Sequence, residues 1–236
     1  MTETKRTFVM KVGEEGVRRE QDILVSERDV TVFLNGESVL KTTCSPGGLK
    51  ELVIGYLVSE GWIAAPSEID LFQVAEDEGA AWATTFRKGS QDVIPPRVWG
   101  RFTLSKDGIF KAVEACVTRG QIFRKTGGTH AAAIASPEGA LHNFFEDISR
   151  TCALEKALGG GLLTDLPLKT ALVVLSSRVS SQFVRKVARC AVPLIAAVSA
   201  PTWNAVEEAR RLGICLCGFV REERLNIYSH PWRVGL

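Results

Sequence analysis

The chain has 236 residues, of which 45% are hydrophobic and 24% charged, a balance typical of a globular protein that buries one or two cores. A formal net charge of +2 excludes a general polyanion-binding surface, so we expect no nucleic-acid partner. No apolar run approaches the ~20 residues that span a bilayer, and the polar start lacks a signal-peptide apolar region. We therefore expect a cytoplasmic protein without membrane contact, in which the six cysteines are reduced thiols.

The first hundred residues predict a small α+β unit. Strands are expected at residues 7–12, 30–42, 69–75 and 80–87, the second of them folded into a hairpin at Asn35-Gly36. Ser45 suits an N-cap and Pro46 a first helical position, and the apolar residues that follow keep helical spacing up to Gly61. Residues 87–100 predict a loop, so we place the domains at 1–105 and 106–236.

Strands and helices alternate in the second part. Strands are expected at 131–135, 140–145, 171–175, 193–198, 214–220 and 224–229, and helices at about 109–123, 151–158, 180–191 and 202–212. Two of these strands, 171–175 and 193–198, are apolar without alternation, as expected for strands buried on both faces. Gly159-Gly160-Gly161 predicts the end of the helix at 151–158. This order predicts an α/β layer with a largely parallel sheet.

A β-hairpin in the middle of the chain brings polar groups together. Ser136-Pro137-Glu138-Gly139 suits a type I turn between two short apolar strands. Because antiparallel strands return the chain to its starting point, residues 126–130 should face residues 146–150. Glycines let backbone approach a ligand, and the neighbouring hydroxyl, imidazole, carboxylate and guanidinium groups can bind it. The expected ligand contacts are Thr126, Gly127, Gly128, Thr129, His130, Asp147 and Arg150. A purely structural role for His130 is the alternative.

Two strand ends in the second part are polar in the same way. Ligands of α/β sheets bind beyond the carboxyl ends of strands, and hydroxyls beside a helix N-terminus suit a phosphate. Arg178 adds a planar fork of donors for the same anion. The residues expected to hold it are Ser176, Arg178, Ser180, Ser199 and Thr202. The alternative is that the serines and the threonine only cap the helices that follow.

Several blocks along the chain resemble the FdhD family of formate dehydrogenase accessory proteins. The blocks are CSPGGLKELVIGYLVSEGWI (44–63), TGGTHAAA (126–133), EDISRTCALEK (146–156), SSRVSSQFVRKVARC (176–190), AAVSAPTWNAVEEA (196–209) and GFVREERLNIYSHP (218–231). Together they cover well over half the chain, and several blocks in the same order are far more specific than one motif.

The resemblance implies an α/β fold with a cytidine-deaminase-like C-terminal domain and a smaller α+β N-terminal domain. It implies binding of the cofactor molybdenum bis(molybdopterin guanine dinucleotide), hence of guanine nucleotide. Sulfur would come from a cysteine desulfurase and pass to the cofactor, which formate dehydrogenase requires; a homodimer is a possible assembly. The family's cofactor-binding stretch falls on Phe219, Val220, Arg221, Glu222, Glu223 and Arg224. Its arginines, with Arg150 and Arg178, are expected to pair with phosphates.

The chain departs from the family pattern at the sulfur carrier. The family carries sulfur on a C-x-x-C cysteine in the loop between the domains, and residues 87–106 contain no cysteine. The family's glycine, arginine and histidine at a helix start are Ser149, Arg150 and Thr151 here. If sulfur is carried, Cys152 is the candidate thiol, because a helix N-terminus and Arg150 would favour its thiolate. The alternatives are a small packed side chain at Cys152 and a non-catalytic cofactor carrier.

Other chemistries fit the sequence less well. A zinc deaminase requires H-x-E or C-x-E with P-C-x-x-C, whereas His130 is followed by Ala131 and Ala132 and no P-C-x-x-C exists. The three histidines lack metal-ligand spacing, so we expect no metal site. A generic nucleotide-binding regulator would explain the strand-end loops but not the ordered family blocks.

Overall fold

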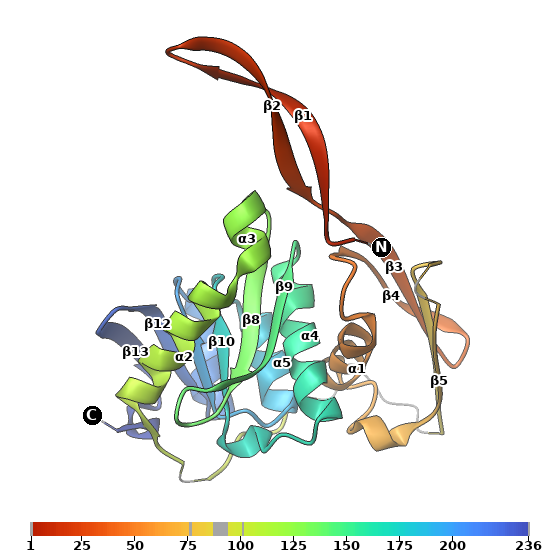
Figure 1. Cartoon of the computed structure of the whole chain (residues 1–236). Helices are drawn as coiled ribbons and strands as arrows, with labels where there is room; N and C mark the ends of the chain where they lie inside the picture. Colours follow the sequence, from red (N-terminus) through yellow and green to blue (C-terminus); the bar gives the residue numbers. More distant parts are fainter. Residues whose placement is uncertain (1, 76, 87–93, 101, 236) are drawn as a thin grey trace.

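The computed structural model describes residues 2–75, 77–86, 94–100 and 102–235 (Figure 1). Part of the loop expected at 87–100, and the last residue of the strand expected at 80–87, lie outside the described residues. The elements up to that loop are β1 (Thr4–Gly13), β2 (Gly16–Val25), β3 (Arg28–Leu34), β4 (Glu37–Cys44), α1 (Leu49–Glu60), η1 (Pro66–Glu68), β5 (Ile69–Ala75) and β6 (Ala80–Thr85). The elements after it are β7 (Leu104–Ser105), α2 (Lys106–Arg119), α3 (Gln121–Thr126), β8 (His130–Ala135), β9 (Leu141–Asp147), α4 (Arg150–Leu163), η2 (Leu168–Thr170), β10 (Leu172–Leu175), α5 (Ser181–Arg189), β11 (Leu194–Ala197), α6 (Trp203–Leu212), β12 (Cys215–Arg221), β13 (Arg224–Ser229), η3 (Pro231–Arg233) and β14 (Val234–Gly235).

A four-stranded sheet in the order β4-β3-β6-β5 forms the first part. The hairpin expected at Asn35-Gly36 is confirmed, since both residues have positive φ, at 51° and 84°. Helix α1 ends at Gly61 as expected, but it begins at Leu49 after Gly48, so the N-cap expected at Ser45 is wrong. Instead, the Ser45 hydroxyl accepts a hydrogen bond from the Ile148 backbone N–H at 3.1 Å.

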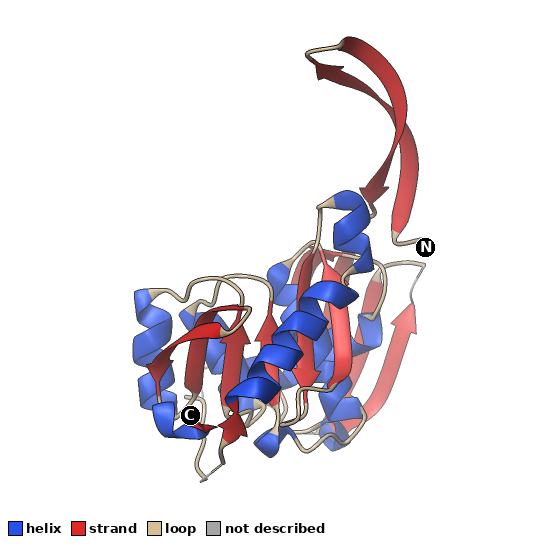
Figure 2. Ribbon diagram, turned by 60° about the vertical axis from the view of Figure 1, so that its left-hand side comes forward, coloured by secondary structure: helices blue, strands red, loops and turns tan. Residues whose placement is uncertain are grey.

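A six-stranded sheet in the order β13-β12-β11-β10-β8-β9 forms the second part. Only β10, β11 and β12 run parallel, and the other neighbours pair antiparallel, so the sheet is mixed rather than largely parallel. Figure 2 shows α2 crossing one face of this sheet. Residues such as Val174 pack on the α2 side and Val173 on the opposite side, with the buried faces of α4, α5 and α6. Burial on both faces explains why the central strands are apolar without alternation.

Helices α1 and α4 cross with almost no space between them. A Cβ at Gly55 would lie 1.8 Å from the Glu155 carbonyl oxygen, and one at Gly159 would lie 1.9 Å from the Glu51 carbonyl oxygen. The helix expected to stop at Gly159-Gly160-Gly161 therefore runs on to Leu163, because these glycines serve close packing and not termination. One hydrophobic cluster runs through α1, α4 and the facing sides of both sheets. The two parts of the chain thus share a core.

Strands β1 and β2 form a hairpin that stands away from the body, which we call the arm (Figures 1 and 2). The sequence predicted only a strand at 7–12; β2 was missed because charged residues interrupt its apolar pattern. None of the described helices is long and apolar enough to cross a membrane.

Candidate functional site

One edge of the six-stranded sheet collects the residues expected to bind a ligand. Strands β10, β11 and β12 end there, the antiparallel β8 begins there, and β9 ends there. His130 pairs with Asp147 in the β8–β9 ladder, as the predicted hairpin requires. The Ala131 N–H donates to the Ser176 hydroxyl at 2.8 Å, which joins the β8 start to the β10 end. The group of residues 126–130 and 146–150, which the sequence predicts to face each other, therefore continues into the loop after β10.

Backbone hydrogen bonds join the remaining loops of this edge. The Val179 N–H donates to the Ala200 carbonyl at 3.1 Å, and the Thr202 N–H donates to the Val179 carbonyl at 2.9 Å. The Phe219 N–H donates to the Ser199 carbonyl at 3.2 Å. The edge from Arg150 to Arg221 is thus one connected surface, which we call the strand-end edge.

Three helices point their N-termini at the strand-end edge: α4, α5 and α6. Ser149 caps α4 by accepting from the Cys152 N–H at 3.3 Å, and Thr202 caps α6 by accepting from the Ala205 N–H at 3.2 Å. Capping therefore accounts for Thr202, whereas the Ser180 side chain makes no cap hydrogen bond to α5. Because each helix N-terminus carries partial positive charge, their convergence favours an anion at this edge.

The electrostatics of His130 show how close the arginines lie. Burial lowers the pKa of His130, and the positive charges of Arg150 and Arg178 lower it further. The imidazole is accordingly held neutral at neutral pH and can both donate and accept a hydrogen bond. A ligand with negative charge would be attracted by the two guanidinium groups beside this neutral imidazole.

The glycine loop before β8 has a different role from the one expected. Gly127 ends α3 with a φ of 66°, and a Cβ at Gly128 would lie 2.8 Å from Cγ1 of Val25. The backbone at Gly128 therefore packs closely against Val25 at the base of the arm, where the sequence predicted close approach to a ligand. The neighbouring hydroxyls are also engaged, since Thr126 donates to the Ile122 carbonyl at 2.8 Å and Thr129 to the Glu146 carboxylate at 3.0 Å.

Asp147 lies inside the protein, where it joins the two parts of the chain. Its side chain is 0% exposed and accepts hydrogen bonds from the backbone N–H groups of Ser45 at 3.2 Å and Ser149 at 2.8 Å. Lys156, equally buried, places its Nζ 2.5 Å from the Asp147 carboxylate and 2.8 Å from the Ser45 carbonyl. The direct ligand contact expected for Asp147 is therefore replaced by a structural one.

A second group of charged side chains, largely buried, connects α1, α4 and α5. Lys186 donates to the carboxylates of Glu60 and Glu155, the latter at 2.7 Å. Burial alone would lower the pKa of Lys186, yet the two carboxylates raise it overall. The sequence did not lead us to predict that Lys156 and Lys186 are buried. Each lysine occupies a position among the apolar residues of its helix, and this pattern could have indicated a buried ion pair.

All six cysteines are buried. Burial raises the pKa of Cys44, Cys116 and Cys190 to about 12. It also raises the pKa of Cys152, whose Sγ lies 3.6 Å from the Thr42 hydroxyl. The expectation that the helix N-terminus and Arg150 favour a Cys152 thiolate is therefore wrong in this conformation, because burial is the largest effect on the pKa of this thiol and disfavours its charged form.

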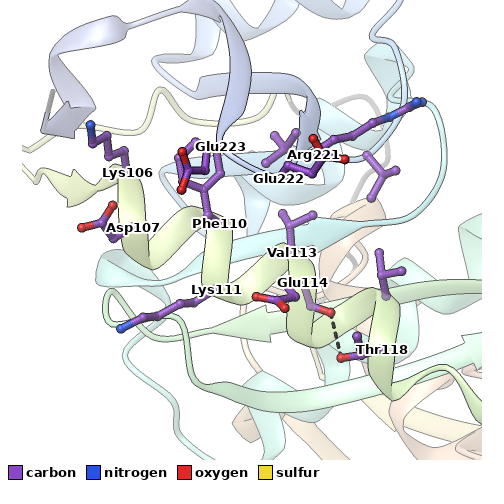
Figure 3. Close-up of a pocket in the computed structure, with 13 residues that line it drawn as sticks. Lys106, Asp107, Phe110, Lys111, Val113, Glu114, Thr118, Arg221, Glu222 and Glu223 are labelled. Atoms are coloured by element: carbon purple, nitrogen blue, oxygen red, sulfur yellow. Dashed lines mark hydrogen bonds between the residues drawn. The ribbon is translucent and has the colours of Figure 1, made fainter.

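Residues 219–224 border two surfaces, the strand-end edge and a groove. Phe219 and Glu222 have positive φ, at 51° and 52°, so the turn between β12 and β13 is sharply bent. Val220 is buried in the hydrophobic cluster on the α2 side. Arg224 lies opposite Arg221 in the backbone register of β12 and β13. A groove of about 770 Å³ opens between this turn and α2 (Figure 3). We call it the α2 groove; its lining includes Phe110, Val117, Val198, Arg221, Glu222 and Glu223.

Comparison with known proteins gives consistent matches along the chain. A model of the FdhD/NarQ family matches residues 25–98 and 84–235. The sulfur carrier protein FdhD of Bacillus pumilus is 36% identical over 238 residues, which cover 90% of this chain and 90% of that protein. The protein of the same name from Methanothermobacter thermautotrophicus is 31% identical, with 92% of this chain and 93% of that protein covered.

The fold also has a close counterpart among solved structures. A candidate formate dehydrogenase accessory protein from Desulfotalea psychrophila superposes with a TM-score of 0.89, covering 99% of this chain and all of that one. At 22% sequence identity, this likeness establishes the mixed α/β fold.

Proposed function

The chain belongs to the FdhD/NarQ family, and from this membership we propose that it is a cytoplasmic formate dehydrogenase accessory protein. In this proposal it binds molybdenum bis(molybdopterin guanine dinucleotide), assists its sulfuration, and delivers it to formate dehydrogenase. A cysteine desulfurase is the proposed sulfur source. The part from residue 106 onwards is proposed to be cytidine-deaminase-like, a view supported by its mixed sheet with helices on both faces.

The strand-end edge is the observation that carries the proposal. Arg150 and Arg178 lie near three helix N-termini, and Arg221 lies at the far end of the same edge. Such a row of cationic and N–H donors fits an elongated ligand with several phosphates. The Ser180 hydroxyl, which caps no helix, is a further donor for one of them.

In the proposed complex each residue has a limited task. Arg178 and Arg221 hold phosphates, while His130, as a neutral imidazole, offers a hydrogen bond to a planar ring edge. The cofactor, when bound, supplies the molybdenum centre that receives sulfur. Asp147 and Lys156 position the edge from beneath and touch no ligand.

Calorimetric titration with guanosine diphosphate tests this placement. We expect the double variant Arg178→Ala, Arg221→Ala to weaken binding by at least about 100-fold, because charge-assisted hydrogen bonds to phosphate contribute ~1.5–3 kcal/mol each. Arg210→Ala is the matched control, since its guanidinium pairs with Glu207 in the last turn of α6. Equal affinity of the double variant and the control would remove the nucleotide from this edge.

A second candidate function is a cofactor carrier that moves no sulfur. Its support is that all six cysteines are buried and that burial raises the pKa of Cys152. Mass spectrometry after incubation with a cysteine desulfurase and cysteine separates the two functions. A persulfide that is lost in Cys152→Ser supports sulfur transfer through a conformation that exposes this thiol. Intact nucleotide binding without any persulfide supports the non-catalytic carrier.

A further inference from the structure

The α2 groove is continuous with the strand-end edge. Val198 lines the groove and directly precedes Ser199, whose carbonyl accepts a hydrogen bond from the Phe219 N–H at 3.2 Å. Arg221, at the far end of the strand-end edge, lines the groove as well. The groove volume of about 770 Å³ lies within the range of roughly 300–1,000 Å³ that is usual for small-molecule sites. A ligand whose phosphates lie at the edge can therefore extend into the groove.

The floor of the α2 groove suits a flat ring. It is apolar, with contributions from Phe110, Val113, Val117, Val198 and Val220. Phe110 is half-buried and packs against the hydrophobic cluster on the α2 side, so its ring is supported from behind and partly open to the groove. An aromatic side chain held in this way offers a fixed face on which a planar heterocycle can stack.

Two opposite charges line the groove without neutralising each other. Arg221 and Glu223 are both exposed, and within the described part of the chain neither side chain forms an ion pair or a hydrogen bond. Figure 3 shows Glu223 on the Phe110 side of the β12–β13 turn and the Arg221 side chain pointing the other way. Glu222, between them, has a φ of 52°, a conformation uncommon for a residue other than glycine. The turn thus separates an acceptor at one end of the groove from a cation at the other.

This separation matches the polarity of a nucleotide with a 2-amino-4-oxo ring. That ring, which guanine and pterin share, presents a ring N–H and an exocyclic amine side by side. An ionised carboxylate only accepts hydrogen bonds, and its two oxygens can accept from both of these donors at once. Adenine presents a ring nitrogen with a lone pair beside its amine, and this nitrogen would repel the same carboxylate.

We propose that the α2 groove binds a 2-amino-4-oxo ring of the cofactor, which stacks on Phe110 and donates its two N–H groups to the Glu223 carboxylate. This inference rests on the proposed function and adds the ring-binding end of that site. Phe110 and Val117 lie about 10 Å apart along α2 at ~1.5 Å per residue, so the ring and the phosphate at Arg221 have room at opposite ends. The cofactor carries two guanine dinucleotides, so another ring remains for His130.

Calorimetry with matched nucleotides tests the ring contact. Inosine diphosphate lacks only the exocyclic amine of guanosine diphosphate, so the wild-type chain should bind it about 10-fold or more weakly, and adenosine diphosphate more weakly still. Glu223→Ala should bind guanosine and inosine diphosphates equally. The ratio of the two affinities cancels any effect of the lost charge on the phosphates, because both nucleotides carry the same ones. Asp107→Ala is the matched control, since Figure 3 shows this carboxylate pointing away from the turn, and it should keep the wild-type ratio.

A free pterin separates the two sources of the ring. A preference for guanosine over inosine diphosphate that Glu223→Ala abolishes places guanine in the groove. Pterin binding that Glu223→Ala abolishes, without a nucleotide preference, places the pterin there and equally supports the proposal. If neither ring depends on Glu223 while the variant Arg178→Ala, Arg221→Ala still loses guanosine diphosphate, the groove assignment is wrong and the proposed function stands. A wild-type chain that binds neither ligand contradicts both.

Photochemical labelling with 8-azidoguanosine diphosphate tests the location when guanine is the ring bound. Label should appear on α2, in the tryptic peptides 107–111 or 112–119, and excess guanosine diphosphate should suppress it. Phe110→Leu keeps an apolar side chain but removes the stacking face, and should weaken guanosine diphosphate about 5-fold or more with an unchanged melting temperature. Label confined to residues after Trp203 on α6 would place the base on the opposite side of the sheet and overturn the proposal.

Discussion

Replacing Lys156 by methionine tests the claim that a buried ion pair holds the two parts of the chain together. Methionine keeps much of the volume and length of the side chain but removes the ammonium group. Asp147, 0% exposed, would then keep only the backbone N–H donors of Ser45 and Ser149. Removing one partner of a buried pair costs ~3–5 kcal/mol, and the surviving amide donors place this case near the lower end.

The expected loss is large compared with the total stability of ~5–15 kcal/mol for a typical domain. Urea unfolding followed by tryptophan fluorescence would measure it, with exposed Lys50→Met as the control, expected to stay within ~0.5 kcal/mol of wild type. Adding Asp147→Asn to Lys156→Met removes the orphaned charge and should recover about half of the loss. A single variant that loses less than about 1 kcal/mol, or a double variant no more stable than the single one, would refute this reasoning.

The other predictions concern packing, electrostatics and acid stability. Gly55→Ala should lower the free energy of unfolding in urea by about 3 kcal/mol, because its Cβ would lie 1.8 Å from the α4 backbone. A variant more stable than wild type, as the higher helix propensity of alanine alone would give, would contradict the close packing. Arg150→Ala should raise the pKa of His130 in an NMR titration, since the guanidinium contributes to lowering it. An unchanged pKa would show that the Arg150 charge does not act on His130. The hydrogen bond from Arg211 lowers the pKa of Glu208 to about 2, so its stabilising contribution is present above pH 4.5 and lost as the pH falls towards 2. Glu208→Gln should therefore flatten the stability profile in that pH window, and an identical profile would show that the pair contributes nothing.

Local sequence signals were sufficient for the central hairpin and the strand-end loops. Serine, proline and glycine at 136–139 define a turn, and the Gly139 N–H does donate to the Ser136 carbonyl at 3.0 Å. The apolar runs before Ser176 and Ser199 require burial on both faces, which only a central strand provides. These inferences depend on residues that are neighbours in the sequence and on the regular geometry of strands, so no knowledge of distant contacts is needed.

The tertiary structure decided what depends on residues far apart in the chain. Gly159 can end a helix or let another helix approach, and the choice depends on α1, a hundred residues earlier. A lysine such as Lys156 is ordinarily at the surface, and only the position of Asp147 makes its burial tolerable. Composition and spacing placed Cys152 at a helix start, but its reactivity depends on desolvation by residues from other elements. The sequence thus determined most of the elements and the family, whereas burial, which depends on contacts between distant residues, determined which of the expected residues are accessible to a ligand.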